Sequence, residues 1–163
     1  MVDIKQLMIL ITIFINYGVV NMALWQVCFN IVEKNKEQDD DVLLWKRDII
    51  KIAKEITFLE ENSWSDSILQ YGKSDLTCIE IYLDDDKKRV EEISVRIDLR
   101  ELDFEMIHNI LKYIMNLDAD IYYNDKIYNP DIKTIKEILI SSDAFKYCKS
   151  PHEYIENIGR TVK

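Results

Sequence analysis

The stretch Val90-Glu-Glu-Ile-Ser-Val-Arg-Ile-Asp-Leu99 decides the fold. Ile93, Val95 and Ile97 alternate in it with polar residues, and this period of two predicts a β-strand that buries one face. Residues 76–83 alternate in the same way, and residues 84–88 between the two segments predict a turn. We therefore expect an antiparallel hairpin. Its solvent face is expected to carry Glu80, Tyr82, Glu92, Ser94 and Arg96.

The segments on either side of this hairpin predict a sheet with helices beside it. Alternation predicts strands over 23–33 and 119–123, with a short partner for the second at 127–128. Helical spacing of apolar residues predicts the helices, which are expected over 40–56, over 103–117, from Pro130 through Leu139 and over 151–158. Residues 57–75 are expected to be a loop with a short helical turn. The sequence therefore predicts the α+β class: a mostly antiparallel sheet of about four to five strands, with three to four helices packed mainly on one face.

Size and composition restrict the classes of function. The 163 residues suit one domain, and Lys+Arg 21 against Asp+Glu 30 gives a net charge of -9. A nucleic-acid-binding protein that covers phosphates is disfavoured, because the acidic chain would repel them. Only three glycines occur, all isolated, so neither of the common Gly-rich phosphate loops is present. We therefore expect neither nucleic acid nor a nucleotide cofactor as a ligand.

The first 21 residues differ from the rest of the chain. Residues 7–15 are almost wholly apolar, but Asn16 and Asn21 interrupt the run before it reaches the length of a membrane span. Three interpretations are open: a dispensable extension before a natural start at Met22, a membrane anchor or export signal within residues 7–24, and a folded first helix. We expect a single α+β domain over 22–163, preceded by an apolar extension over 1–21.

Cysteine and histidine are too few and too far apart to predict a metal site or a nucleophile. Cys28, Cys78 and Cys148 are odd in number and widely spaced, so we expect three buried thiols rather than a disulfide framework. His108 and His152 are distant from each other, and zinc sites need closer ligand pairs. No metal or other cofactor is predicted.

A row of charges ends the hairpin. Arg96, Asp98 and Arg100 alternate with Ile97 and Leu99, which places all three charges on one strand face. We expect a charge ladder, in which these side chains pair with Glu80 or Glu92 or cap the following helix. The alternative is a small enzyme of unrecognised class with a site at this row.

Several aromatic residues have no clear place in the core, and an acidic turn lies among them. Exposed aromatic side chains supply contact area, and nearby carboxylates attract basic partners. The candidate partner interface consists of Trp64, Tyr71, Tyr82, Asp84, Asp85, Asp86, Tyr122 and Tyr128.

Five segments carry a resemblance to a group of proteins. They are residues 63–72 (SWSDSILQYG), 78–82 (CIEIY), 95–100 (VRIDLR), 118–122 (DADIY) and 142–154 (SDAFKYCKSPHEY). The chain resembles, over roughly 22–158, small bacterial immunity proteins of polymorphic or contact-dependent toxin systems. The resemblance implies a cytoplasmic, non-enzymatic protein that binds and neutralises one toxin domain, often a nuclease.

The charge and the missing catalytic motifs agree with that expectation. An acidic inhibitor can place carboxylates where a nuclease binds phosphates, and long-range attraction then speeds association. We therefore expect an immunity protein whose partner is a cognate toxin with a basic surface. The alternatives are the small enzyme described above and a membrane-anchored protein.

Overall fold

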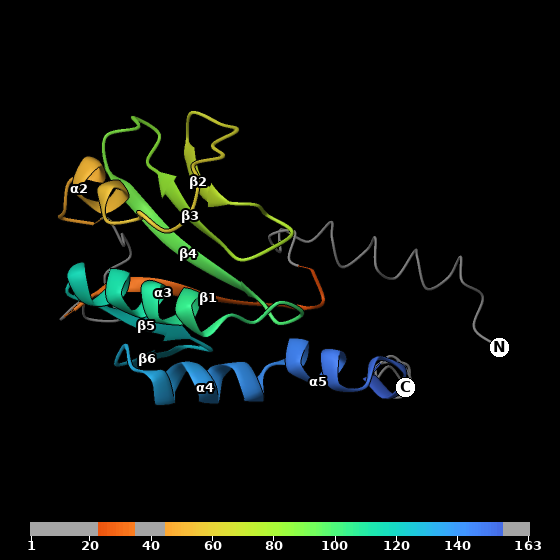
Figure 1. Cartoon of the computed structure of the whole chain (residues 1–163). Coiled ribbons are helices and arrows are strands. Elements are labelled where there is room, and N and C mark those ends of the chain that lie inside the picture. Colours follow the sequence, from red (N-terminus) through yellow and green to blue (C-terminus); the bar gives the residue numbers. More distant parts are fainter. Residues whose placement is uncertain (1–22, 35–44, 155–163) are drawn as a thin grey trace.

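The computed structural model describes residues 23–34 and 45–154, whose strands form a six-stranded antiparallel sheet (Figure 1). The strand order across the sheet is β2-β3-β4-β1-β5-β6. The strands are β1 (Gln26–Glu33), β2 (Ile68–Gly72), β3 (Cys78–Leu83), β4 (Val90–Asp98), β5 (Ala119–Tyr123) and β6 (Lys126–Tyr128). The helices are α2 (Ile49–Lys54), α3 (Phe104–Asn116), α4 (Ile132–Ser141) and α5 (Asp143–Lys149).

The strand registers gather the apolar residues on one face. Val95 of β4 lies between Phe29 of β1 and Ile79 of β3, while Ile93 lies between Ile31 and Ile81. Because side chains alternate along a strand, this register puts every second apolar residue on the same side of the sheet. The antiparallel hairpin predicted from residues 76–99 is confirmed as β3 and β4.

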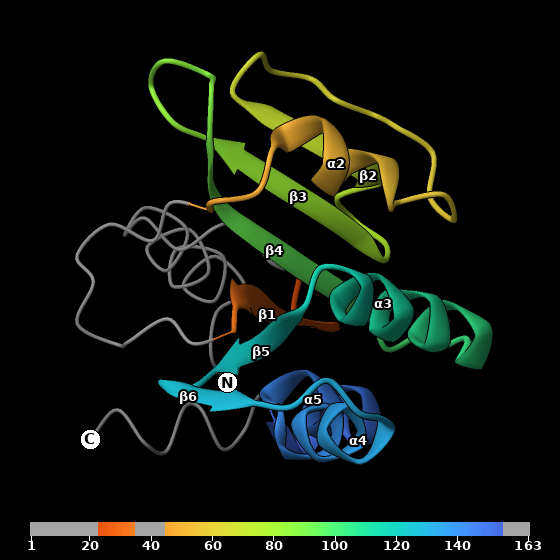
Figure 2. The same cartoon turned by 90° about the vertical axis from the view of Figure 1, so that its left-hand side faces the viewer.

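The helices pack their apolar stripes against that face. α3 begins at Asp103, whose side chain accepts a hydrogen bond from the backbone N–H of Glu105. Ile110 and Ile114 of α3 and Ile135 of α4 are fully buried, and they belong to one core with the apolar strand residues. Figure 2 shows α3 beside β4 and β1, α2 over β2 and β3, and α4 and α5 at the β5–β6 end.

The structure confirms the α+β class and the antiparallel sheet, but the expected count of four to five strands is wrong. The additional strand is β2, which falls in the segment expected to be a loop. β2 is an edge strand, and the preceding loop bonds to it: the N–H of Gly72 donates to Glu60 O at 2.7 Å, and the N–H of Asn62 donates to Gln70 O at 2.7 Å. These contacts join residues several positions apart, so local periodicity does not show them.

Two helix predictions also need correction. Among the described residues of the expected helix 40–56, the helix begins only at Ile49, after the N-cap Asp48. Trp45 is buried outside the helix, and its backbone N–H donates to Val90 O at 2.8 Å. α5 was not expected; it begins at the N-cap Ser142, whose hydroxyl accepts from the N–H of Phe145. A further helical segment begins at Pro151, as predicted.

The predictions for residues 1–21 and for the start of the helix expected over 40–56 lie outside the described residues. Within residues 23–34 and 45–154, no helix has both the length and the apolar character needed to cross a membrane.

Candidate binding surfaces

A buried ion pair lies on the face of β3 and β4 opposite the apolar core. Arg96 Nη2 donates to Glu80 Oε2 at 2.6 Å, and the two side chains are only 4% and 5% exposed. The Tyr82 hydroxyl donates to the same Glu80 oxygen at 2.7 Å. Ser94, between Arg96 and Glu92 on this face, is also buried. The expectation of a solvent face is therefore wrong for Glu80, Ser94 and Arg96, because the charges neutralise each other within the structure.

The rest of the charged row is also paired. Asp98 is buried, and Arg100 donates to it from Nη2 at 2.7 Å. Burial raises the pKa of Asp98, but hydrogen bonds from the Arg100 side chain and backbone outweigh it, so the pKa lies below its ordinary value. The Arg100 guanidinium also lies over the Trp25 ring, 4.1 Å from its centroid. The expected charge ladder is confirmed at these residues, and this pairing favours a structural role over a catalytic one.

The cysteines do not form a reactive group in the described residues. Cys78 is buried, and burial raises the pKa of its thiol to about 12. Cys28 is half-buried, with its Sγ 3.1 Å from Ser94 Oγ. Cys148 is exposed, so the expectation of a buried thiol is wrong there. The described residues also contain no group of three or more side chains that could hold a metal ion.

Trp64 is the most exposed of the three tryptophans, and its position is nevertheless defined. Its side chain is 69% exposed, and its Nε1 donates to Gln70 Oε1 at 3.1 Å. Gln70 is buried on β2, so the hydrogen bond anchors the indole to the sheet. The loop that carries Trp64 is tied to the β3–β4 turn, because Lys87 Nζ donates to Asp66 Oδ2 at 3.0 Å. An exposed, oriented aromatic side chain of this kind suits a contact with another protein.

The three aspartates of the β3–β4 turn, Asp84, Asp85 and Asp86, have different roles. Asp84 Oδ1 accepts from the backbone N–H groups of Lys88 at 2.7 Å and Arg89 at 3.0 Å. These hydrogen bonds, that of Arg89 first, hold the pKa of Asp84 below its ordinary value. Asp84 therefore shapes the turn, whereas Asp85 and Asp86 are exposed. We call Trp64, Asp66, Asp85 and Asp86 the Trp64 edge.

The structure does not bring the remaining predicted interface residues to this edge. Tyr71 is only 9% exposed and belongs to the core, so its assignment to a surface is wrong. Tyr82 is half-buried and bound to Glu80. Tyr122 and Tyr128 lie on β5 and β6, at the opposite edge of the sheet from β2 and β3. The predicted interface is therefore not one patch, because β1 and β4 lie between its two groups.

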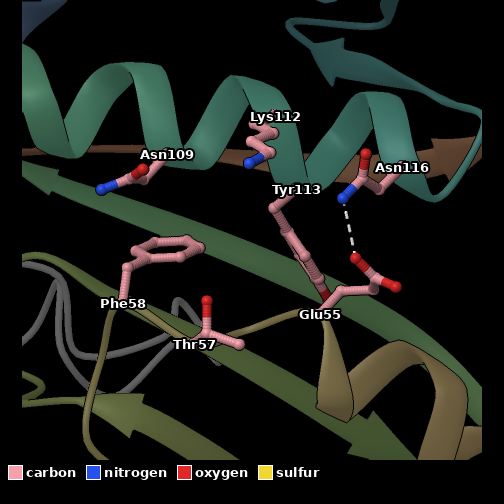
Figure 3. Close-up of a pocket in the computed structure, with 7 residues that line it drawn as sticks. All are labelled: Glu55, Thr57, Phe58, Asn109, Lys112, Tyr113 and Asn116. Carbon is pink, nitrogen blue, oxygen red and sulfur yellow. Dashed lines mark hydrogen bonds between the residues drawn. The ribbon is translucent and has the colours of Figure 1, made fainter.

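A pocket of about 160 Å³ lies between the α2–β2 connection and α3 (Figure 3). One wall consists of Glu55, Thr57 and Phe58. The Phe58 ring meets the Tyr113 ring edge-on, with centroids 6.5 Å apart. Sequence reasoning did not find this pocket, because its two walls come from segments more than fifty residues apart.

The other wall of the pocket belongs to α3. It consists of Asn109, Lys112, Tyr113 and Asn116. Asn116 Nδ2 donates to Glu55 Oε2 at 2.7 Å and so joins the two walls (Figure 3). Tyr113 is 1% exposed, and its hydroxyl has no hydrogen-bond partner among the described residues. Burial, then the neighbouring Tyr71 and Glu55, raise the pKa of this phenol.

We expect Tyr113→Phe to raise the free energy of unfolding by about 1 kcal/mol, because it removes a buried hydroxyl that lacks a partner. Urea unfolding of both proteins measures the difference. Tyr123→Phe, on a half-buried tyrosine, is the control and should have a smaller effect. A loss of stability on Tyr113→Phe would show that the hydroxyl makes a favourable hydrogen bond.

Comparisons with known proteins found no relatives. No family model matches the chain, and searches of curated proteins and of solved structures gave no match.

Proposed function

We propose that the protein acts by stoichiometric binding, as an immunity protein that neutralises a bacterial toxin domain with a basic surface. The observation that carries the proposal is the Trp64 edge: an exposed indole is anchored to Gln70, and its loop is tied through Asp66 and Lys87 to the turn that carries the exposed Asp85 and Asp86. Exposed aromatic anchors recur at protein interfaces, and charged side chains near them attract the partner. Lys87 pairs with Asp66 and Lys88 with Asp86, while Asp85 is in no ion pair among the described residues. The resemblance to immunity proteins and the net charge of -9 support the same proposal.

The chemistry of the edge suits a basic partner, and a nuclease is one such class. Nuclease active sites attract phosphates, and the exposed carboxylate of Asp85 can occupy a similar position. Asp66 and Asp86 would join it by exchanging the exposed Lys87 and Lys88 for cations of the partner. The indole would supply most of the desolvated contact area, while the carboxylates would raise the association rate. The hydrogen bond from Trp64 to Gln70 and the ion pair of Lys87 with Asp66 hold this edge in place. The protein would act in the cytoplasm and without a cofactor.

The experiment is co-expression and direct binding with the toxin encoded beside this gene. Deletion of the gene is expected to remove protection, and the purified proteins should form a complex. Trp64→Ala should weaken the complex by about 2–4 kcal/mol, roughly 30- to 1,000-fold in Kd, as for other interface anchors. Isothermal titration calorimetry measures the affinity.

Phe104→Ala is the matched control for this variant. Phe104 is also a highly exposed aromatic residue, but it begins α3 beyond the C-terminal end of β4, whereas the loop of Trp64 is tied to the turn before β4. We expect no change in affinity for this control. Equal losses for both variants, or protection without any complex, would contradict the proposal.

A further inference from the structure

The pocket between the α2–β2 connection and α3 is rich in hydrogen-bond acceptors. The Glu55 carboxylate accepts from Asn116 through Oε2, and its Oε1 has no partner among residues 23–34 and 45–154. Thr57 and Asn109 add side-chain oxygens to the lining. Glu55 is exposed, so water hydrates this oxygen, and a donor-rich cation can replace that water with a charge-assisted hydrogen bond.

Aromatic groups complete this site. Phe58 is half-buried, and its ring and the Tyr113 ring form one corner of the pocket (Figure 3). The Tyr113 hydroxyl is buried, so a guest would contact the Phe58 ring and the Glu55 carboxylate rather than this hydroxyl. A cation in such a site can interact with the faces of the aromatic rings as well as with the charge of the carboxylate.

We propose that this pocket binds the guanidinium group of an arginine side chain on the protein partner. The proposal rests on the proposed function for the identity of the partner as a basic protein. The guanidinium would donate to Glu55 Oε1 and lie against the Phe58 ring. Arginine fits better than lysine, because its planar group is weakly hydrated, stacks on rings and donates from several nitrogens.

Lys112 makes it possible to test whether the pocket prefers a cationic or an anionic guest. Its side chain lines the pocket and is exposed, so its ammonium group opposes a cationic guest. Removing this charge should strengthen the binding of a cation and weaken the binding of an anion. Glu55→Gln should do the opposite, and glutamine retains an oxygen that can accept from Asn116.

The probe is ethylguanidinium chloride, titrated into the full chain and followed by the NMR signals of the Asn109 and Asn116 side-chain amides. Ethylurea is its uncharged isostere, and sodium chloride matches the ionic strength. We expect saturable shifts with a Kd on the order of 10 mM for ethylguanidinium and none for ethylurea. Glu55→Gln should weaken binding about tenfold, and Lys112→Met should strengthen it about twofold. Glu60→Gln, an exposed glutamate outside the pocket, is the control and should change nothing.

The outcomes separate this proposal from the proposed function. Absence of saturable shifts, equal shifts with ethylurea, or weaker binding in Lys112→Met would overturn the assignment of the pocket. Acetate binding that Lys112→Met abolishes would assign the pocket to an anion instead and overturn it also. A toxin complex that depends on Trp64 would still support the proposed function in each of these cases. Conversely, probe binding without any toxin complex would leave the pocket assigned and contradict the proposed function.

Discussion

Arg96→Met is expected to lower the free energy of unfolding by about 3–5 kcal/mol, because it leaves the Glu80 carboxylate buried without its cation. The two side chains are almost solvent-free and 2.6 Å apart, so water cannot replace the lost partner without opening the structure. The Tyr82 hydroxyl would remain as a donor to Glu80, but one neutral hydrogen bond does not compensate a buried charge. Urea unfolding at neutral pH measures the loss.

Two variants make this prediction specific. Lys88→Met breaks an exposed pair on the same hairpin, in which Lys88 and Asp86 lie 4.0 Å apart, and should cost less than about 1 kcal/mol. The double variant Arg96→Met/Glu80→Leu removes both charges and should recover part of the loss. A loss in Arg96→Met no larger than that in Lys88→Met would show that the pair is solvated in solution.

Gly72→Ala is expected to lower the free energy of unfolding by about 2–4 kcal/mol through the backbone alone. Gly72 ends β2 with a φ of 81°, a conformation that residues with a Cβ rarely adopt. A Cβ at this position would lie 2.5 Å from the backbone oxygen of Thr77. Because that oxygen belongs to the chain entering β3, a side-chain rotation cannot relieve the contact.

Ser74→Ala is the control, because Ser74 is exposed in the same β2–β3 connection and its side chain makes no hydrogen bond in the described structure. It should change stability by less than about 0.5 kcal/mol. Thermal and urea unfolding compare the two variants. Equal stabilities would mean that the connection adopts another conformation in solution. β2 also carries Gln70, which anchors Trp64, so Gly72→Ala should additionally weaken binding of the proposed toxin partner.

The elements that sequence reasoning predicted correctly are those in which the pattern and the packing agree. In β4, Ile93, Val95 and Ile97 are spaced for one face of a strand, and all three are buried on that face. In α3, Ile110 and Ile114 are spaced for one stripe of a helix and are buried against the sheet. A strong period identifies the element, because only one secondary structure places such residues on a common face.

The candidate site was predictable only in part. Trp64 and the exposed Asp85 and Asp86 were predicted as surface residues and lie at one edge. Tyr71 was misplaced, because nothing in its irregular neighbourhood shows that it belongs to an edge strand facing the core. No sequence pattern indicated the pocket at Phe58 and Tyr113, since it exists only where α3 meets the connection after α2.

The sequence by itself determined the class of the fold, the hairpin of β3 and β4 and the acidic character of the surface. These properties depend on residue type and on spacing within one segment. The tertiary structure alone decided that Glu80 and Arg96 are buried together, that β2 joins the sheet and that the loop of Trp64 is tied to the β3–β4 turn. The physical reason is that polar side chains alternate identically on a solvated face and on a buried face that pairs its charges. Which of the two occurs depends on partners far away in the chain.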